Sequence, residues 1–279
     1  MQRIEVGYVD VRNPFYPQQV SRILLDQEHI DAFVFCTKNP LPALPYLDAL
    51  DAYKIMFHVT LTPYRKDIEP YVPDKREVLK AIQILSKRFG PDFVFVRYDP
   101  IFINDTYTLE YHAFMFERLC KSLQGFIHTV IISFLDMKKN TKKHQDACAL
   151  QEPTLQEVHA IASRLASIAQ RYEIKIQTCA EPYDLSAYGV RQGSCINALS
   201  MYNLTEKNKR YPKNKNREYC HCLESVDIGA YNCCPHFCRY CYANYDEKQV
   251  GANQKKHKRS SSLLIGELDA NDTITIRKK

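Results

Sequence analysis

The chain has 279 residues, of which 45% are hydrophobic and 25% charged, a balance typical of a globular protein long enough for one large domain. It contains no run near the roughly 18 apolar residues of a membrane helix, and its first residues lack the apolar core of a secretory signal. We therefore expect a cytoplasmic protein with no membrane partner. The net charge of +6 comes mainly from two basic runs, residues 207–217 and 255–259, which either contact nucleic acid or are solvated surface.

Short runs rich in Val, Ile and Phe alternate with amphipathic stretches through the first three quarters of the chain. This pattern predicts parallel strands joined by crossover helices. The expected strands cover residues 32–37, 55–61, 92–98, 129–134 and 174–178, with further strands at 226–230 and, at the edge of a sheet, at 273–276. The expected helices cover residues 74–89, 108–123 and 154–172, and the last begins with a capping box formed by Thr154 and Glu157.

Such a series of strands and helices forms either a barrel or an open doubly wound sheet, and both bind ligands at the carboxyl ends of the strands. The polar residues at these predicted ends are Thr37, Lys38, Thr60, Thr62, Arg97, Asp99, Ser133, Asp136, Gln177, Cys179 and Glu181. Any one of them also suits a helix cap or a loop hydrogen bond. Our candidates for contacts with substrate or cosubstrate are Arg97, Asp99 and Glu181. Because Arg97 and Asp99 point to the same side of a strand, they equally suit a buried ion pair.

Eleven cysteines in a chain of this size without an export signal indicate metal binding rather than disulfides. The segment at 227–244, DIGAYNCCPHFCRYCYAN, places Cys234, Cys238 and Cys241 at the spacing C-x3-C-x2-C. Three such thiolates can ligate three irons of a [4Fe–4S] cluster and leave the fourth iron open. The spacing resembles the signature of radical S-adenosylmethionine (SAM) enzymes, in which an aromatic residue, here Tyr240, precedes the last cysteine. This resemblance implies that SAM binds the open iron, that Tyr240 lies near the adenine, and that a reductant such as flavodoxin or ferredoxin supplies the electron.

Zinc is the alternative, because Cys220, Cys222, Cys233 and His221 offer the fourth ligand of a tetrahedral site. Cys233 is otherwise interpreted as a bystander. A second candidate metal site is formed by Cys179, Cys195, Cys220 and Cys222. These residues hold another iron–sulfur cluster or a zinc ion if their loops converge, and Cys179 and Cys195 are core residues if they do not. We expect Cys36, Cys120 and Cys148 to be structural.

The whole chain resembles the bacterial DUF1848 family, a domain of unknown function whose members carry a radical-SAM-like cysteine motif near the C-terminal end. The matching stretches are VRNPF at Val11, TKNP at Thr37, TLTPY at Thr60, RYDPI at Arg97, ISFLD at Ile132, QTCAE at Gln177, the cysteine segment at Asp227 and LLIGEL at Leu263. The resemblance implies a partial TIM-like (β/α) barrel with mostly parallel strands in permuted order, because the cluster loop of radical SAM enzymes normally follows the first strand. It also supports the second cysteine set.

The sequence departs from the family pattern at two places. Members usually begin with a Ser-Arg-Arg-Thr-Asp-Ile-Pro-like segment that would add a strand, whereas this chain starts at what looks like the end of a helix before Gly7. Without that strand, the chain would bind the cosubstrate poorly or be a truncated product. The second departure is Phe237, where we expect glycine before Cys238, and a bulky side chain there would narrow the approach to the open iron.

These observations predict four regions: a β/α barrel body at 1–202, a basic linker at 203–219, an iron–sulfur segment at 220–245 that completes the barrel, and a basic tail at 246–279. The predicted function is a radical SAM-type iron–sulfur enzyme that generates a 5'-deoxyadenosyl radical on an unknown substrate. The alternatives are a zinc-stabilised protein that associates with nucleic acid and a truncated, inactive member of the family.

Overall fold

A six-stranded sheet forms the centre of the molecule in the computed structural model, which describes residues 2–197 and 218–277. Its strands, in spatial order, are β3 (Phe33–Thr37), β4 (Ile55–Thr60), β5 (Val94–Ile101), β6 (Thr129–Phe134), β7 (Lys175–Cys179) and β8 (Arg191–Gly193). All neighbouring pairs are parallel, and each strand lies beside the one that precedes it in the chain. Within the described residues β3 and β8 are free edges, so the fold is α/β with an open parallel sheet rather than a closed barrel.

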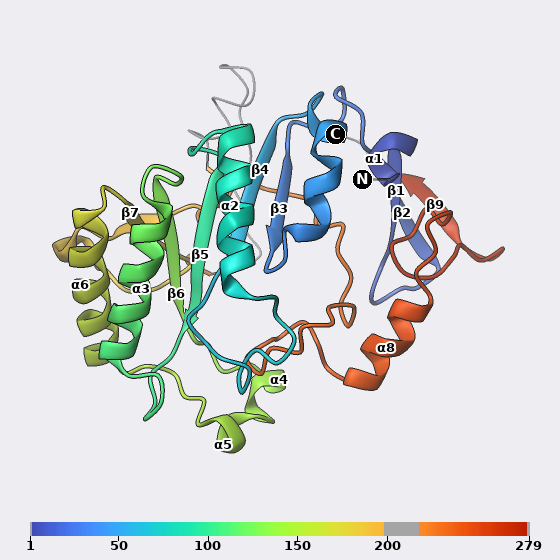
Figure 1. Cartoon of the computed structure of the whole chain (residues 1–279). Helices are drawn as coiled ribbons and strands as arrows, with labels where there is room; N and C mark the ends of the chain where they lie inside the picture. The colour runs from blue at the N-terminus through green and yellow to red at the C-terminus, as the bar shows by residue number, and fades with distance from the viewer. Residues whose placement is uncertain (1, 198–217, 278–279) are drawn as a thin grey trace.

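The helices are α1 (Gln2–Val6), α2 (Lys75–Phe89), α3 (Leu109–Leu123), α4 (Lys139–Lys142), α5 (Gln145–Cys148), α6 (Leu155–Arg171) and α8 (Glu247–Lys255), with 3-10 helices η1 (Leu41–Leu50) and η2 (Ser186–Tyr188). The long helices α2, α3 and α6 cover one face of the sheet (Figure 1). They begin where the sequence predicts, since Asp74 and Thr154 accept hydrogen bonds from the first-turn amides and Glu157 completes the capping box. None of the described helices is long and apolar enough to cross a membrane.

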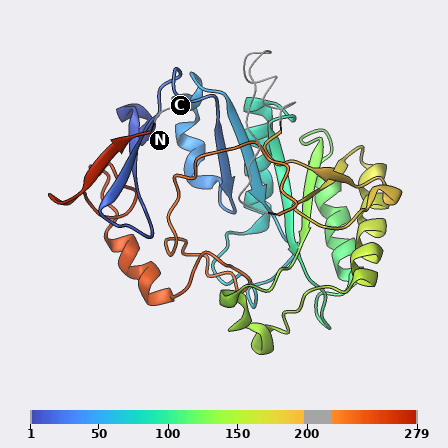
Figure 2. The ribbon, with the colours of Figure 1, turned by 180° about the vertical axis from the view of Figure 1, so that it is seen from behind.

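The two faces of the parallel sheet carry different residues. On the helix side, alternate residues such as Val94, Val96 and Tyr98 of β5 belong to the main core. On the other side, here called the inner face, Phe95 and Ile131 pack against cysteines and Leu223. Figure 2 shows that the chain after residue 217 runs across this inner face, which the long helices leave uncovered. The inner face is therefore where polar side chains of the strands meet the cysteine-rich segment.

A smaller sheet joins the two ends of the chain. In it, β1 (Tyr8–Arg12) is antiparallel to β2 (Gln19–Leu24), and β2 is parallel to β9 (Thr273–Ile276). The guanidinium of Arg12 bonds to the carboxylate of Asp272, at 2.5 Å, which ties β9 to the N-terminal hairpin. The predicted strand at 273–276 is thus confirmed, in a sheet separate from the central one.

The strand predicted at 226–230 is wrong, because these residues have no strand structure. The carboxylate of Asp227 accepts a hydrogen bond from the amide of Gly229, at 2.7 Å, and this local turn replaces extended pairing. Of the predicted basic linker, only residues 218 and 219 are described.

Candidate functional site

The motif cysteines lie in one irregular loop that packs under the carboxyl ends of β3 and β4. The backbone amide of Arg239 donates to the carbonyl of Ile68 at 2.9 Å, and the amide of Cys241 donates to the carbonyl of Cys238 at 3.0 Å. Cys238 is buried, whereas Cys234 and Cys241 are partly exposed. Burial raises the pKa of the Cys238 thiol to about 12, while the ammonium of Lys38 opposes this rise. The loop therefore brings its three thiols into one partly buried place beside a positive charge.

The spacing of these thiols decides what they can bind. Among the described residues, only Asp26, Glu28 and His29 form a group of three potential ligands whose atoms all lie within 4.8 Å of one another. Those three side chains belong to a mostly exposed turn. The three motif thiols do not form such a group, so their sulfurs are more widely spread than the ligands of a single ion. This spread suits separate irons of one cluster better than a single zinc ion.

A buried carboxylate that the sequence analysis missed anchors the motif loop to the sheet. Glu69 is only 1% exposed in its side chain and pairs with the ammonium groups of Lys38 and Lys75, at 2.8 and 2.6 Å. It also accepts hydrogen bonds from the hydroxyls of Thr62, at 2.5 Å, and of Tyr240. Burial by itself raises the pKa of Glu69, but the two lysines outweigh it and lower this pKa to about 2. The loop is thus fixed by an ionised group.

Tyr240, predicted to lie near an adenine, is buried in this network. Its ring centroid is 5.7 Å from that of Tyr64 and 5.4 Å from the ammonium of Lys38, and its hydroxyl bonds to Glu69. These contacts give Tyr240 an anchoring role, and a contact with adenine stays a prediction.

Phe237 adopts a backbone conformation that normally belongs to glycine. Its φ is +49°, in the left-handed region, and its ring packs edge-on against Tyr71 with centroids 5.8 Å apart. The backbone turns sharply just before Cys238, and this turn requires the positive φ that glycine adopts most easily. This is the physical reason to expect glycine at position 237.

The second cysteine set converges at the β8 side of the inner face. Cys179 ends β7 and Cys195 follows β8, and both lie with Cys222 in one buried cluster. The backbone amide of Cys195 also donates to the Cys222 sulfur at 3.2 Å, and Cys222 is in contact with Cys220. The contact with Cys195 lowers the pKa of both Cys179 and Cys222. The four cysteines thus lie side by side, whereas their binding of a metal stays a prediction.

The candidate substrate contacts are already engaged by the protein. Arg97 forms an ion pair with Asp99 at 2.5 Å and donates from Nη1 to the Cys195 sulfur at 2.9 Å. The carboxylate of Glu181 accepts from the backbone amide of Phe134 at 2.9 Å. The structure therefore places Arg97 and Asp99 beside the second cysteine set, and Glu181 at the end of β6.

The remaining cysteines differ in their surroundings. Cys120 is buried in α3 and fits the predicted structural role. Cys36 does not fit this role, because it is exposed on the inner face of β3, which is an edge strand among the described residues. Cys233, interpreted as a bystander, donates from its thiol to the carbonyl of Ala230 at 2.7 Å.

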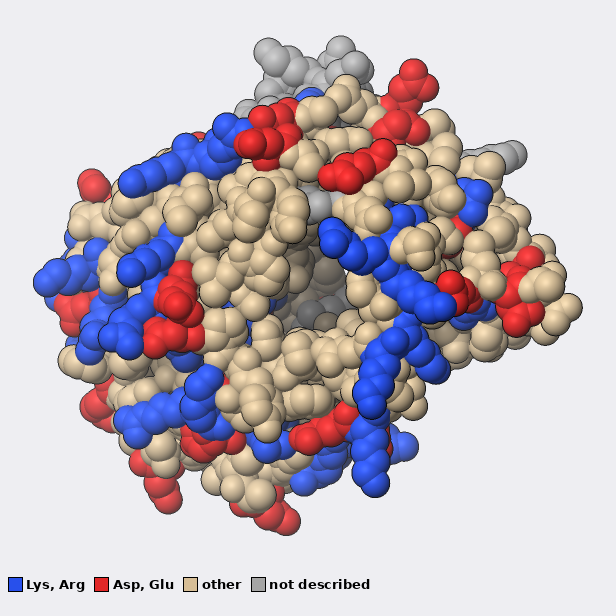
Figure 3. Space-filling view, turned by 45° about the vertical axis from the view of Figure 1, so that its right-hand side comes forward, with Lys and Arg blue, Asp and Glu red and all other residues tan. Residues whose placement is uncertain are grey.

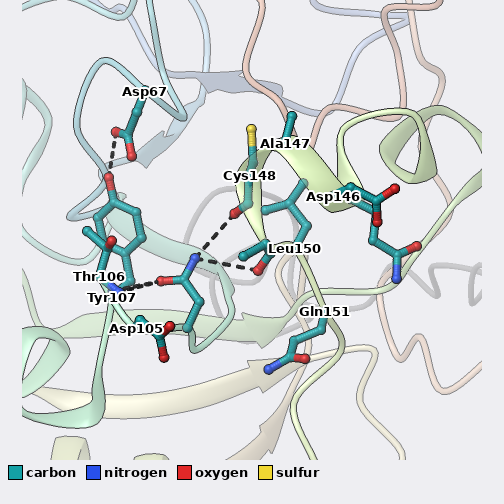
Figure 4. Close-up of a pocket in the computed structure, with 12 residues that line it drawn as sticks. Asp67, Asp105, Thr106, Tyr107, Asp146, Ala147, Cys148, Leu150 and Gln151 are labelled. Carbon is teal, nitrogen blue, oxygen red and sulfur yellow. Dashed lines mark hydrogen bonds between the residues drawn. The ribbon is translucent and has the colours of Figure 1, made fainter.

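The surface of the described residues is hollowed in several places. Figure 3 shows a hollow with Lys and Arg side chains gathered along one side of it. A separate cavity of about 620 Å³ lies between the loop before α3 and helix α5, where three acidic residues and Cys148 face it (Figure 4). Asn104 closes one side by donating to the carbonyls of Cys148 and Ala149, at 3.2 and 3.4 Å. The motif cysteines do not line this cavity.

The sequence model of a family described as a domain of unknown function, DUF1848, matches residues 1–243. No curated protein matches the chain. No solved structure matches it either.

Proposed function

The chain belongs to the DUF1848 family, and we propose that it is a cytoplasmic iron–sulfur enzyme of radical SAM type. In this proposal Cys234, Cys238 and Cys241 ligate a [4Fe–4S] cluster whose fourth iron binds SAM. The observation that carries it is the position of the C-x3-C-x2-C loop, which packs at the carboxyl ends of parallel strands, where α/β folds bind their ligands. When bound together, the cluster and SAM supply a 5'-deoxyadenosyl radical that abstracts hydrogen from the substrate.

The residues around the loop suit an anionic cluster. Lys38 and Lys75 bring two positive charges to the buried Glu69, so this network carries one net positive charge close to the sulfur of Cys238. A positive charge favours thiolates over thiols and so favours metal ligation. Through its bond to Glu69, Tyr240 holds the last turn of the motif against the sheet.

The open parallel sheet is consistent with a partial barrel. In this proposal the order of the elements is permuted, because the cluster loop comes from the C-terminal segment and does not follow the first strand. We propose that the substrate binds on the inner face and that a flavodoxin or a ferredoxin reduces the cluster. Tyr240 is proposed to lie near the adenine of SAM, with the polar strand ends around it.

Anaerobic reconstitution tests this proposal. The wild-type chain, Cys238→Ala and Cys120→Ala are reconstituted side by side, and iron, sulfide and zinc are counted. Cys120 is the matched control because it is also a buried cysteine but lies in helix α3, away from the motif. We expect Cys238→Ala to lose about four irons and Cys120→Ala to lose none.

Electron paramagnetic resonance of the reduced protein then tests the open iron. A spectrum that changes when SAM is added supports the radical SAM assignment. If the spectrum of the cluster does not change when SAM is added, the chain is an iron–sulfur protein that does not carry out radical SAM chemistry. Zinc without iron, together with salt-dependent binding to nucleic acid, would replace the proposal with that of a zinc-stabilised binding protein.

A further inference from the structure

Four cysteines from three separate segments meet at the edge of the inner face, away from the motif loop. Cys179 and Cys195 are each 7% exposed and Cys222 is 9% exposed, and all three belong to one buried cluster against which Cys220 packs. The backbone amide of Leu223 donates to the carbonyl of Ile196 at 2.9 Å, which fixes the segment of Cys220 and Cys222 beside that of Cys195. The backbone amide of Cys195 donates to the Cys222 sulfur at 3.2 Å, which ties these two segments together.

We propose that Cys179, Cys195, Cys220 and Cys222 form a second metal centre with four thiolate ligands. Its ligands share no residue with the motif loop, so it does not depend on the radical SAM proposal. Four sulfurs and no oxygen ligand suit a thiophilic metal. No three of these sulfurs lie within 4.8 Å of one another, so their spread, like that of the motif thiols, suits an iron–sulfur cluster better than a single zinc ion.

The guanidinium of Arg97 distinguishes this group from ordinary core cysteines. A core cysteine packs as a small apolar residue and needs no cation beside it. Here Arg97, with a side chain only 17% exposed, points one N–H at the Cys195 sulfur at 2.9 Å while Asp99 holds its other edge. A donor with a positive charge is suited to a thiolate ligand, and N–H bonds to ligating sulfurs are a regular feature of iron–sulfur sites.

Metal counting in a chain that lacks the first centre isolates the second. We expect Cys238→Ala to keep about four irons with sulfide rather than zinc, and Cys238→Ala/Cys195→Ser to lose this cluster. The double variant Cys238→Ala/Cys120→Ser is the control and should keep it. If Cys238→Ala binds neither metal, the second centre is refuted, whatever the wild-type chain shows of the first.

Mass spectrometry of alkylated cysteines tests the centre in the unmodified chain, without dependence on a variant that folds. We expect the four thiols to be protected from iodoacetamide until a chelator removes the metal. Cys36 is exposed and should react in both states, whereas Cys120 is buried and should react in neither. If a disulfide reductant removes the protection of the four thiols from iodoacetamide and a chelator does not, the cysteines form a disulfide and the proposal is overturned.

Discussion

Replacement of Glu69 by glutamine tests whether an ion network holds the motif loop. The carboxylate is 1% exposed and contacts two ammonium groups and two hydroxyls. Its pKa is about 2 against an ordinary value of 4.5, and this difference corresponds to about 3 kcal/mol of stability at neutral pH. Because Glu69→Gln leaves two partly buried lysines without their counter-charge, we expect the free energy of unfolding to fall by about 3 kcal/mol.

The pH dependence of the same variant gives the reasoning its sharpest test. A lowered pKa means that the unfolded chain takes up the proton first, so the contribution of Glu69 is complete above about pH 4.5 and is lost as the pH falls toward about 2. Urea unfolding followed by circular dichroism should therefore show a gap between wild type and Glu69→Gln that narrows over this range. Glu267→Gln, which breaks the exposed pair with Lys258, is the control and should change little. A gap that is the same at every pH would refute the argument.

Three further changes test separate features. Phe237→Gly should be more stable in urea than Phe237→Ala by about 1 kcal/mol, because both lose the contact with Tyr71 but only glycine adopts a φ of +49° without strain, and equal stabilities would contradict this. Thr154→Ala should lower the free energy of unfolding by about 1 kcal/mol, since it removes the capping box of α6, whereas the neighbouring exposed Gln156→Ala should have little effect. Arg97→Gln should keep the metal of the second centre but alter its absorption spectrum if it is an iron–sulfur cluster, and an unchanged spectrum would mean that Arg97 does not act on the sulfur.

The helices and most central strands could be predicted because their signals are local. The long helices carry an apolar stripe and a capping residue, and β4 and β6 are short apolar runs of the kind that parallel sheets require. Strand β8 has no such signal, since its three residues Arg-Gln-Gly are polar or small. Strand β8 packs closely against Gln177 of β7, because a Cβ on Gly193 would lie only 2.6 Å from the Gln177 side chain. Glycine is needed there for a reason that the local sequence does not show.

The candidate site could be predicted only in part, because some of its contacts join residues that are far apart in the sequence. The motif cysteines are close in sequence, so their spacing alone predicts a shared site. Glu69 follows β4 without any pattern around it, and its bond to Tyr240 spans 171 residues. The contact of Cys195 with Cys222 spans 27 residues and depends on where β8 ends. Only the folded chain can bring such groups together.

One segment, residues 220–241, carries cysteines of both candidate sites, and this arrangement connects the two sites along the chain. Residues 224–231 between the two sites are mostly exposed and form no strand, so apolar burial contributes little to holding them on the sheet. At one end Cys222 and Leu223 contact the second set, and at the other Arg239 and Tyr240 contact the loop after β4. Because metal ligation adds its binding energy to folding, each proposed centre would fix its own end of the segment on the sheet.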